Sequence, residues 1–468
     1  MSIEIYNKAN VVPGEDMSCS ISLPMIHYPT RSMPKVGHIM LSAWDIHHIQ
    51  YLAIKHSNDH RALIIQNFDE LAQLVNRYRG YENSCSNTEY LSIAKLHGIL
   101  KYLIGMTSEQ FLYHNKSLGW AIERFNRNYH ILVASKSIER AINVDDIVKE
   151  KFGLFAEELM VVLLMIFWLC SQNPDILTAP ENLYRKKDST VFTKENIEKV
   201  VRYYAVSYDE VRESTLGYQI FYSKPFVKTQ KGKTLMTNLY LIIMLIADGL
   251  YWIVRDYYRE IDNQSFTNDF GLMFESYLLE LCGKYLNTNQ FEKLPQRRAK
   301  SADFVIYFEK AVLLIEVKSA LFDIGAKQQR PNMERINKYF SRNINQARSQ
   351  LSESEKCING DKPIIKVIIL YENFQNSSLL QMAIKESYPD DKNLFVATAN
   401  DFENLLSLYC ANNSKVEDIL SDWVAHANGS FMDFHDALKN IEYVGKRHLL
   451  DTINHFDALM NTFKNELI

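Results

Sequence analysis

Residues 311–322 read AVLLIEVKSALF, an apolar run interrupted by one acid, Glu316, and one base, Lys318. The run has the length and the aliphatic composition of a buried strand. Side chains alternate across a strand, so these two charges point to the same side of the sheet. The fold and the chemistry of the chain have to account for this pair.

A second predicted strand, DFVIYF over 303–308, precedes the first and forms a hairpin with it. If Glu309–Lys310 make the turn, paired positions have numbers that sum to 619, and Asp303 lies opposite Glu316. The Cβ atoms of such a pair are roughly 5 Å apart. Two facing carboxylates repel and are costly to keep ionised on a partly buried sheet, and a divalent cation between them removes that cost. The alternative is a strand end that leaves the core with its charges in solvent.

The elements around the hairpin predict an α/β fold, a mixed sheet flanked by helices in the order αβββαβ. In chain order they are a helix over 268–286, a short strand over 290–294, the hairpin, an amphipathic helix over 332–353 and an apolar strand over 363–371. A helix over 377–388, a strand over 394–398 and a helix follow. We expect Asn400 to cap that last helix, with Glu403 at its third position.

Composition indicates a globular protein, with 47% hydrophobic and 23% charged residues. The six cysteines are scattered without a CxxC pair, which favours a reducing compartment, the cytoplasm, over a disulfide framework or a zinc site. Two apolar stretches, 159–170 and 239–254, are expected to be buried helices rather than membrane spans. The first is too short, and the second contains Asp248 and Gly249.

Positive charge is concentrated around the hairpin. Residues 293–348 contain twelve Lys and Arg against five Asp and Glu, in a chain of net charge −4. Such a segment is a candidate polyanion-binding face, and a solvated, salt-bridged surface explains it equally well.

Asp303 followed by Glu316-Val317-Lys318, in this order of helices and strands, resembles the PD-(D/E)XK, or restriction-endonuclease-like, nuclease superfamily. The resemblance covers about 265–410. It implies a Mg²⁺ ion, with Mn²⁺ as the substitute, held by Asp303, Glu316 and the backbone carbonyl of Val317. Such an ion can activate a water and neutralise charge on a phosphate. Lys318 can orient or deprotonate that water or stabilise the transition state, and the sequence leaves these roles open.

The resemblance also implies accessory residues. Glu275, in FGLMFESYL, matches a helix glutamate that joins the catalytic set, against the alternative of a solvent-facing side chain. Gln346 and Gln350 lie four apart on one helical face and match a glutamine found in the helix after the hairpin. Five cations near the hairpin are candidates for binding nucleic-acid phosphates, although a solvated loop would account for their charge nearly as well. They are Arg297, Arg298, Lys300, Lys327 and Arg330.

The predicted domains are a mainly α-helical N-terminal region (1–260) for regulation, sensing or partner binding, a nuclease domain (261–410) and a helical tail (411–468). The expected activity is that of a Mg²⁺-dependent deoxyribonuclease, with RNA as the alternative substrate. The sequence leaves open whether it acts as an endonuclease or an exonuclease. Bacterial defence against foreign DNA is one setting for such an activity. A homo-oligomer or a protein partner is expected through the N-terminal region. The rival interpretation is a catalytically silent module that binds nucleic acid or acts as a protein-interaction scaffold.

Overall fold

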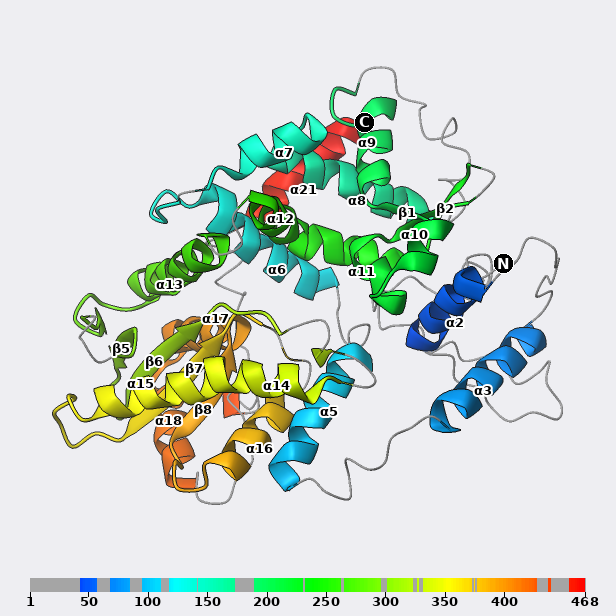
Figure 1. Cartoon of the computed structure of the whole chain (residues 1–468). Coiled ribbons are helices and arrows are strands. Elements are labelled where there is room, and N and C mark those ends of the chain that lie inside the picture. The colour runs from blue at the N-terminus through cyan, green and yellow to red at the C-terminus, as the bar shows by residue number, and fades with distance from the viewer. Residues whose placement is uncertain are drawn as a thin grey trace, which may run out of the picture.

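A five-stranded mixed sheet forms one end of the molecule (Figure 1). Its strand order is β4-β5-β6-β7-β8, with β4, β5 and β6 antiparallel and β6, β7 and β8 parallel. The strands are β4 (Phe291–Lys293), β5 (Phe304–Tyr307), β6 (Val312–Lys318), β7 (Ile364–Leu370) and β8 (Leu394–Thr398). The central strands β6 and β7 are apolar on both sides because helices cover both faces of the sheet.

The computed structural model describes most of the chain. The described residues are 43–56, 68–84, 95–110, 118–140, 142–172, 189–229, 232–261, 265–295, 301–322, 326–327, 331–372, 374, 377–426, 437–438 and 454–467. Within them the protein is mixed α/β and mostly helical, with two small sheets.

The β5–β6 hairpin has the predicted register. Phe304 pairs with Ile315, and Tyr307 with Val312, so the paired numbers sum to 619. The turn closes where the Phe308 amide donates to the Ala311 carbonyl over 2.9 Å. The register shifts by one residue at the start of β5, where the Asp303 amide donates to the Ile315 carbonyl over 3.0 Å. Asp303 and Phe304 therefore both stand opposite Ile315, and the predicted pairing of Asp303 with Glu316 is not part of the ladder.

Helices cover the two faces of the sheet in pairs. On one face pack α13 (Ser265–Tyr285) and α17 (Ala399–Ala411), and on the other α15 (Gln346–Glu355) and α16 (Ser377–Ser387). The helix predicted over 332–353 is present as α14 (Met333–Phe340), a π-helical turn η8 (Ser341–Asn345) and α15. From α13 to β7 the chain thus contains one helix, three strands, the helix made of α14, η8 and α15, and one strand.

The cap predicted for the helix after β8 is wrong. Thr398, the last residue of β8, is the N-cap of α17, and it forms a capping box with Asp401. The Thr398 side chain accepts from the Asp401 amide, and the Asp401 carboxylate accepts from the Thr398 amide over 2.8 Å. Because β8 runs directly into α17, Thr398 stands immediately before the helix, and its hydroxyl can accept from an amide of the first turn. Asn400 already lies inside the helix and cannot be its N-cap. Asn400 and Glu403 bind Arg127 instead.

The described part of the N-terminal region is mainly helical, as predicted, and also contains a small sheet that the sequence pattern did not predict. Its three-residue strands are β1 (Ala205–Ser207), β2 (Phe226–Lys228) and β3 (Thr234–Met236), too short to show an alternating pattern. The helices are α2 (Ala43–His56), α3 (Phe68–Ser84), α5 (Leu96–Gln110), α6 (Leu118–Tyr129), η3 (His130–Ala134), α7 (Val144–Phe152), α8 (Ala156–Gln172), α9 (Lys194–Tyr203), α10 (Tyr208–Glu213), η6 (Gly217–Gln219), α11 (Ile220–Ser223) and α12 (Leu239–Ile261).

The two apolar stretches, 159–170 and 239–254, lie in α8 and α12 and are largely buried in the core. Across the described ranges no single helix has the length and apolar character needed to cross a membrane. One pair, α7 with α8, meets both criteria together, and it is bent by 54°.

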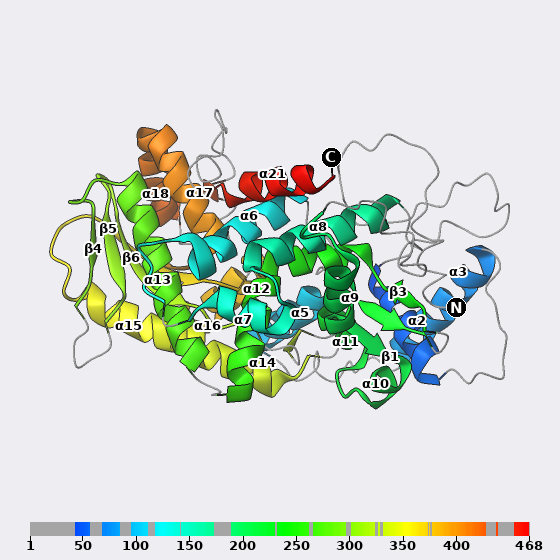
Figure 2. The same ribbon diagram turned by 90° about the horizontal axis from the view of Figure 1, so that it is seen from above.

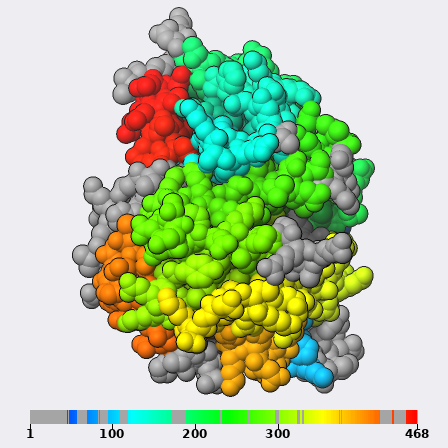
Figure 3. Space-filling model, turned by 90° about the vertical axis from the view of Figure 1, so that its left-hand side faces the viewer, coloured from blue at the N-terminus to red at the C-terminus, as the bar shows by residue number. Residues whose placement is uncertain are grey.

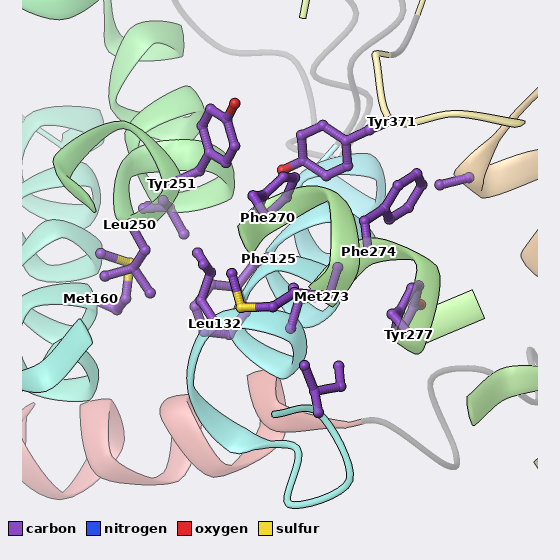
Figure 4. Close-up of a cluster of buried hydrophobic side chains, with 14 of the residues drawn as sticks. Phe125, Leu132, Met160, Leu250, Tyr251, Phe270, Met273, Phe274, Tyr277 and Tyr371 are labelled. Carbon is purple, nitrogen blue, oxygen red and sulfur yellow. The ribbon is translucent and has the colours of Figure 1, made fainter. Parts of the chain in front are cut away.

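One hydrophobic core runs from the N-terminal helices into the sheet. Figure 4 shows side chains of α6, α8 and α12 packed with those of α13 and with Tyr371 after β7. The tail also returns to the N-terminal region. Its described helices are α18 (Asn413–His426) beside α17, and α21 (His455–Leu467), which packs against α6 and α8 (Figure 2).

Candidate active site

Asp303 and Glu316 lie close together at one end of the hairpin. Asp303 stands directly before β5, and its carboxylate is near enough to Glu316 of β6 to act on its ionisation. The Asp303 carboxylate accepts a hydrogen bond of 2.7 Å from the amide of Val317, the residue that follows Glu316. This bond fixes one carboxylate against the backbone of the strand that carries the other.

The surroundings of Glu316 oppose its ionisation. The residue is 1% exposed, and its Oε2 has no hydrogen-bond partner among the described residues. Burial and then repulsion by Asp303 raise the pKa of Glu316 to about 8, against the lowering effects of Lys318 and Gln350. Burial also raises the pKa of Asp303 to about 6, with a smaller contribution from Glu275 and an opposing one from the Val317 amide. Two carboxylates thus share a site that disfavours their negative charge.

Lys318 lies beside this pair and is held from two sides. Its Nζ lies 2.6 Å from Glu316 Oε1 and donates to Gln350 Oε1 over 3.3 Å. Gln350 in turn donates to the Ser301 carbonyl over 3.2 Å, two residues before Asp303. The structure therefore brings Gln350 into the cluster. Gln346, one turn earlier in α15, is exposed.

Glu275 reaches the cluster from α13. Its Oε1 lies 2.7 Å from the Nζ of Lys293, and its charge acts on Asp303. Lys293 lies in β4, opposite Phe304, and was not among the predicted residues. Lys293 could have been predicted from the sequence, because it belongs to the short predicted strand QFEKL (290–294). If that strand pairs with β5, Lys293 lies next to Asp303.

The donor set fits a hard divalent cation that keeps part of its water shell. No group of three or more His, Cys, Asp or Glu side chains that could hold a metal ion occurs within the described part of the chain. Two carboxylates do converge, and Mg²⁺ is often bound by one or two carboxylates together with waters and phosphate oxygens. The partnerless Oε2 of Glu316 supports this fit, because a buried carboxylate oxygen without a donor is costly and a cation beside it removes the cost.

The predicted phosphate-gripping residues have different outcomes. Lys327 is described, and its Nζ pairs with Glu372 Oε2 over 2.7 Å. Glu372 also accepts from the Phe322 amide over 2.8 Å, so Lys327 takes part in holding the chain that leaves β6. The remaining candidates lie outside the described residues; they are Arg297, Arg298, Lys300 and Arg330.

A buried polar network joins the N-terminal helices to the sheet next to this site. Arg127 of α6 pairs with Glu403 of α17, which also accepts from the Tyr277 hydroxyl over 2.8 Å. Asn128 accepts from the Tyr371 hydroxyl over 2.6 Å, and the Tyr371 amide donates to the Lys318 carbonyl over 2.9 Å. The local pattern gave no signal for these pairs, which join residues far apart in sequence.

Comparisons of the chain with protein-family models, with curated proteins and with solved structures found no match.

Proposed function

We propose that this protein is a metal-dependent nuclease of the PD-(D/E)XK type that hydrolyses phosphodiester bonds, with DNA as the substrate. The observation that supports the proposal is the close approach of two largely buried carboxylates, Asp303 and Glu316, beside an ammonium group, Lys318. A purely structural site would gain nothing from the buried, partnerless oxygen of Glu316.

In this proposal Asp303, Glu316 and the Val317 carbonyl hold Mg²⁺ or Mn²⁺. When bound, the ion supplies Lewis-acid activation of water and neutralises charge on the phosphate. Lys318 then donates to the phosphate oxygen or orients the attacking water. Gln350 fixes the Lys318 ammonium through its side-chain oxygen, since the same amide is anchored on Ser301. Glu275 and Lys293 border the site from α13 and β4.

The proposal is tested with plasmid, linear duplex DNA, single-stranded DNA and RNA in Mg²⁺, Mn²⁺ or EDTA. We expect cleavage in either ion, none in EDTA, and a loss of at least about a hundredfold in Glu316→Gln and Lys318→Gln. Glu353→Gln is the matched control, because Glu353 is an exposed glutamate on α15. Calorimetric Mg²⁺ binding that disappears in Glu316→Gln and persists in Glu353→Gln is the second readout.

Two results would contradict the proposal. Cleavage by Glu316→Gln at the wild-type rate would place any activity at another site. Nucleic-acid binding by the wild type without cleavage in either ion would favour the rival interpretation of a silent binding module.

A further inference from the structure

The helix that follows the hairpin carries charged side chains of only one sign, positive, over most of its length. From Arg335 to Ser352 the sequence contains four cations and no Asp or Glu, although 56 of the 468 residues of the chain are acidic. These positions form most of the continuous helix made by α14, η8 and α15. One of the four cations, Arg348, pairs with Asp391 over 2.8 Å, so its charge is compensated.

The other three cations are exposed on the side of this helix that faces solvent. We call this side the α14–α15 face, made up of the exposed cations Arg335, Lys338 and Arg342 and the exposed polar residues Asn337, Ser341, Asn345, Gln346 and Ser349. Amide and hydroxyl groups of this kind also donate hydrogen bonds to phosphate oxygens. Figure 3 shows the helix (yellow) as a band on the molecular surface.

Lys338 and Arg342 are four residues apart and carry the same charge. Neither has a carboxylate partner within the described ranges. Like charges at this spacing destabilise a helix by a few tenths of a kcal/mol. The exposed helix α9 is built differently, since Lys194 pairs with Glu198 and Lys199 with Glu195. Uncompensated cations on α14 and η8 therefore have a cost that an anionic partner would offset.

The α14–α15 face leads directly to the candidate active site. Gln350, which holds Lys318, lies on the same helix twelve residues after Lys338, or about 18 Å along the axis. One strand of B-form DNA advances about 3.4 Å per phosphate, so this length matches about five phosphates. A backbone that enters the site can therefore contact both cations at once.

We propose that the α14–α15 face binds the sugar–phosphate backbone of the nucleic acid next to the position that is cut, with Lys338 and Arg342 as phosphate contacts. This inference rests on the proposed nuclease function, which it extends by placing the substrate. The phosphate contacts proposed here, Lys338 and Arg342, differ from the phosphate-binding residues that the sequence analysis expected in the loops around the hairpin.

The test compares Lys338→Glu/Arg342→Glu with Lys228→Glu/Lys392→Glu in the full-length chain. The control pair changes the net charge equally, at exposed positions on β2 and before β8. Fluorescence anisotropy measures the binding of a labelled single strand and a labelled duplex in EDTA, so cleavage plays no part. Lys338→Gln/Arg342→Gln repeats the test without charge reversal, and circular dichroism confirms folding of each variant.

We expect the first pair to weaken binding by roughly ten- to a hundredfold near 0.1 M salt. The slope of log K against log salt should fall by about 1.8 for a duplex or 1.4 for a single strand. The control pair should bind as the wild type does. Equal losses in both pairs, or wild-type binding by the first pair, would overturn the inference. An equal loss for a polyglutamate probe would overturn it in favour of an acidic protein partner.

The two proposals fail in different ways. If the wild type cleaves DNA and Lys338→Glu/Arg342→Glu binds DNA normally, the proposed active site is supported and the proposed binding by the α14–α15 face is refuted. If the wild type never cleaves and the first pair loses binding, the face stands and the nuclease function is wrong.

Discussion

Glu316→Gln should stabilise the metal-free protein at alkaline pH while it abolishes cleavage. In the wild type, burial and Asp303 raise the pKa of Glu316 to about 8. A carboxyl whose pKa is higher in the folded than in the unfolded chain contributes full stability below the unfolded value. That contribution is lost as the pH rises towards the folded value. Glutamine has nearly the same shape and remains neutral, so this loss disappears.

The size of the effect follows from the shift. A rise in pKa from 4.5 to about 8 corresponds to at most about 5 kcal/mol between acid and alkaline pH. Relaxation around the buried group lowers this figure, and we expect about 2–4 kcal/mol between pH 5 and pH 8.5. For a chain of 468 residues the entropy of unfolding is about 1 kcal/mol per kelvin, so the melting temperature should differ by about 2–4 °C.

The assay is thermal unfolding in EDTA at pH 5 and pH 8.5 for the wild type, Glu316→Gln and the control Glu353→Gln. The difference between wild type and Glu316→Gln reports the titration of Glu316 together with its coupling to Asp303 and Lys318, because the groups farther away are common to both proteins. Mg²⁺ should raise the melting temperature of the wild type at pH 8.5 and leave that of Glu316→Gln unchanged. A Glu316→Gln protein that is less stable than the wild type by the same margin at both pH values would refute the reasoning.

Two further changes test the contacts between the N-terminal helices and the rest of the fold. Arg127→Met leaves the carboxylate of Glu403 buried without its cation, and urea unfolding should show a loss of about 3–5 kcal/mol. Gly105→Ala places a Cβ 2.5 Å from the Ala326 carbonyl oxygen and 2.7 Å from Pro331, so α5 must shift and the melting temperature should fall. Wild-type stability in either variant would show that these contacts contribute nothing measurable.

The sequence predicted the parts of the fold that local rules determine. A two-residue turn and strict alternation set the β5–β6 register from Phe304 to Ile315. The shift of one residue at Asp303 lies beyond this alternation and was not predicted. The 3.6-residue spacing of Ile336, Phe340 and Ile344 predicted the helix after the hairpin. Each of these patterns lies within about twenty residues, where the period of the backbone alone decides which side chains meet.

The parts that were missed depend on contacts between distant segments. Glu403 looked like a capping residue by its spacing from Asn400, yet it pairs with Arg127, 276 positions away. The buried partner outweighs the capping pattern, because an unpaired guanidinium in the core costs more than a cap contributes. The π-helical turn η8 likewise leaves no mark in the hydrophobic spacing.

The position of Tyr371 makes the candidate site depend on the N-terminal helices. Its amide holds the carbonyl of Lys318, and its hydroxyl holds Asn128 of α6. Its ring lies against Phe270 and Phe274, and Phe274 directly precedes Glu275. The side chain of Tyr371 therefore contacts α6 and α13, and its backbone amide contacts the strand that carries Lys318. A displacement of α6 would leave the Tyr371 hydroxyl buried without its acceptor, which costs about 1–3 kcal/mol. The geometry of Lys318 and Glu275 is for this reason tied to the packing of α6.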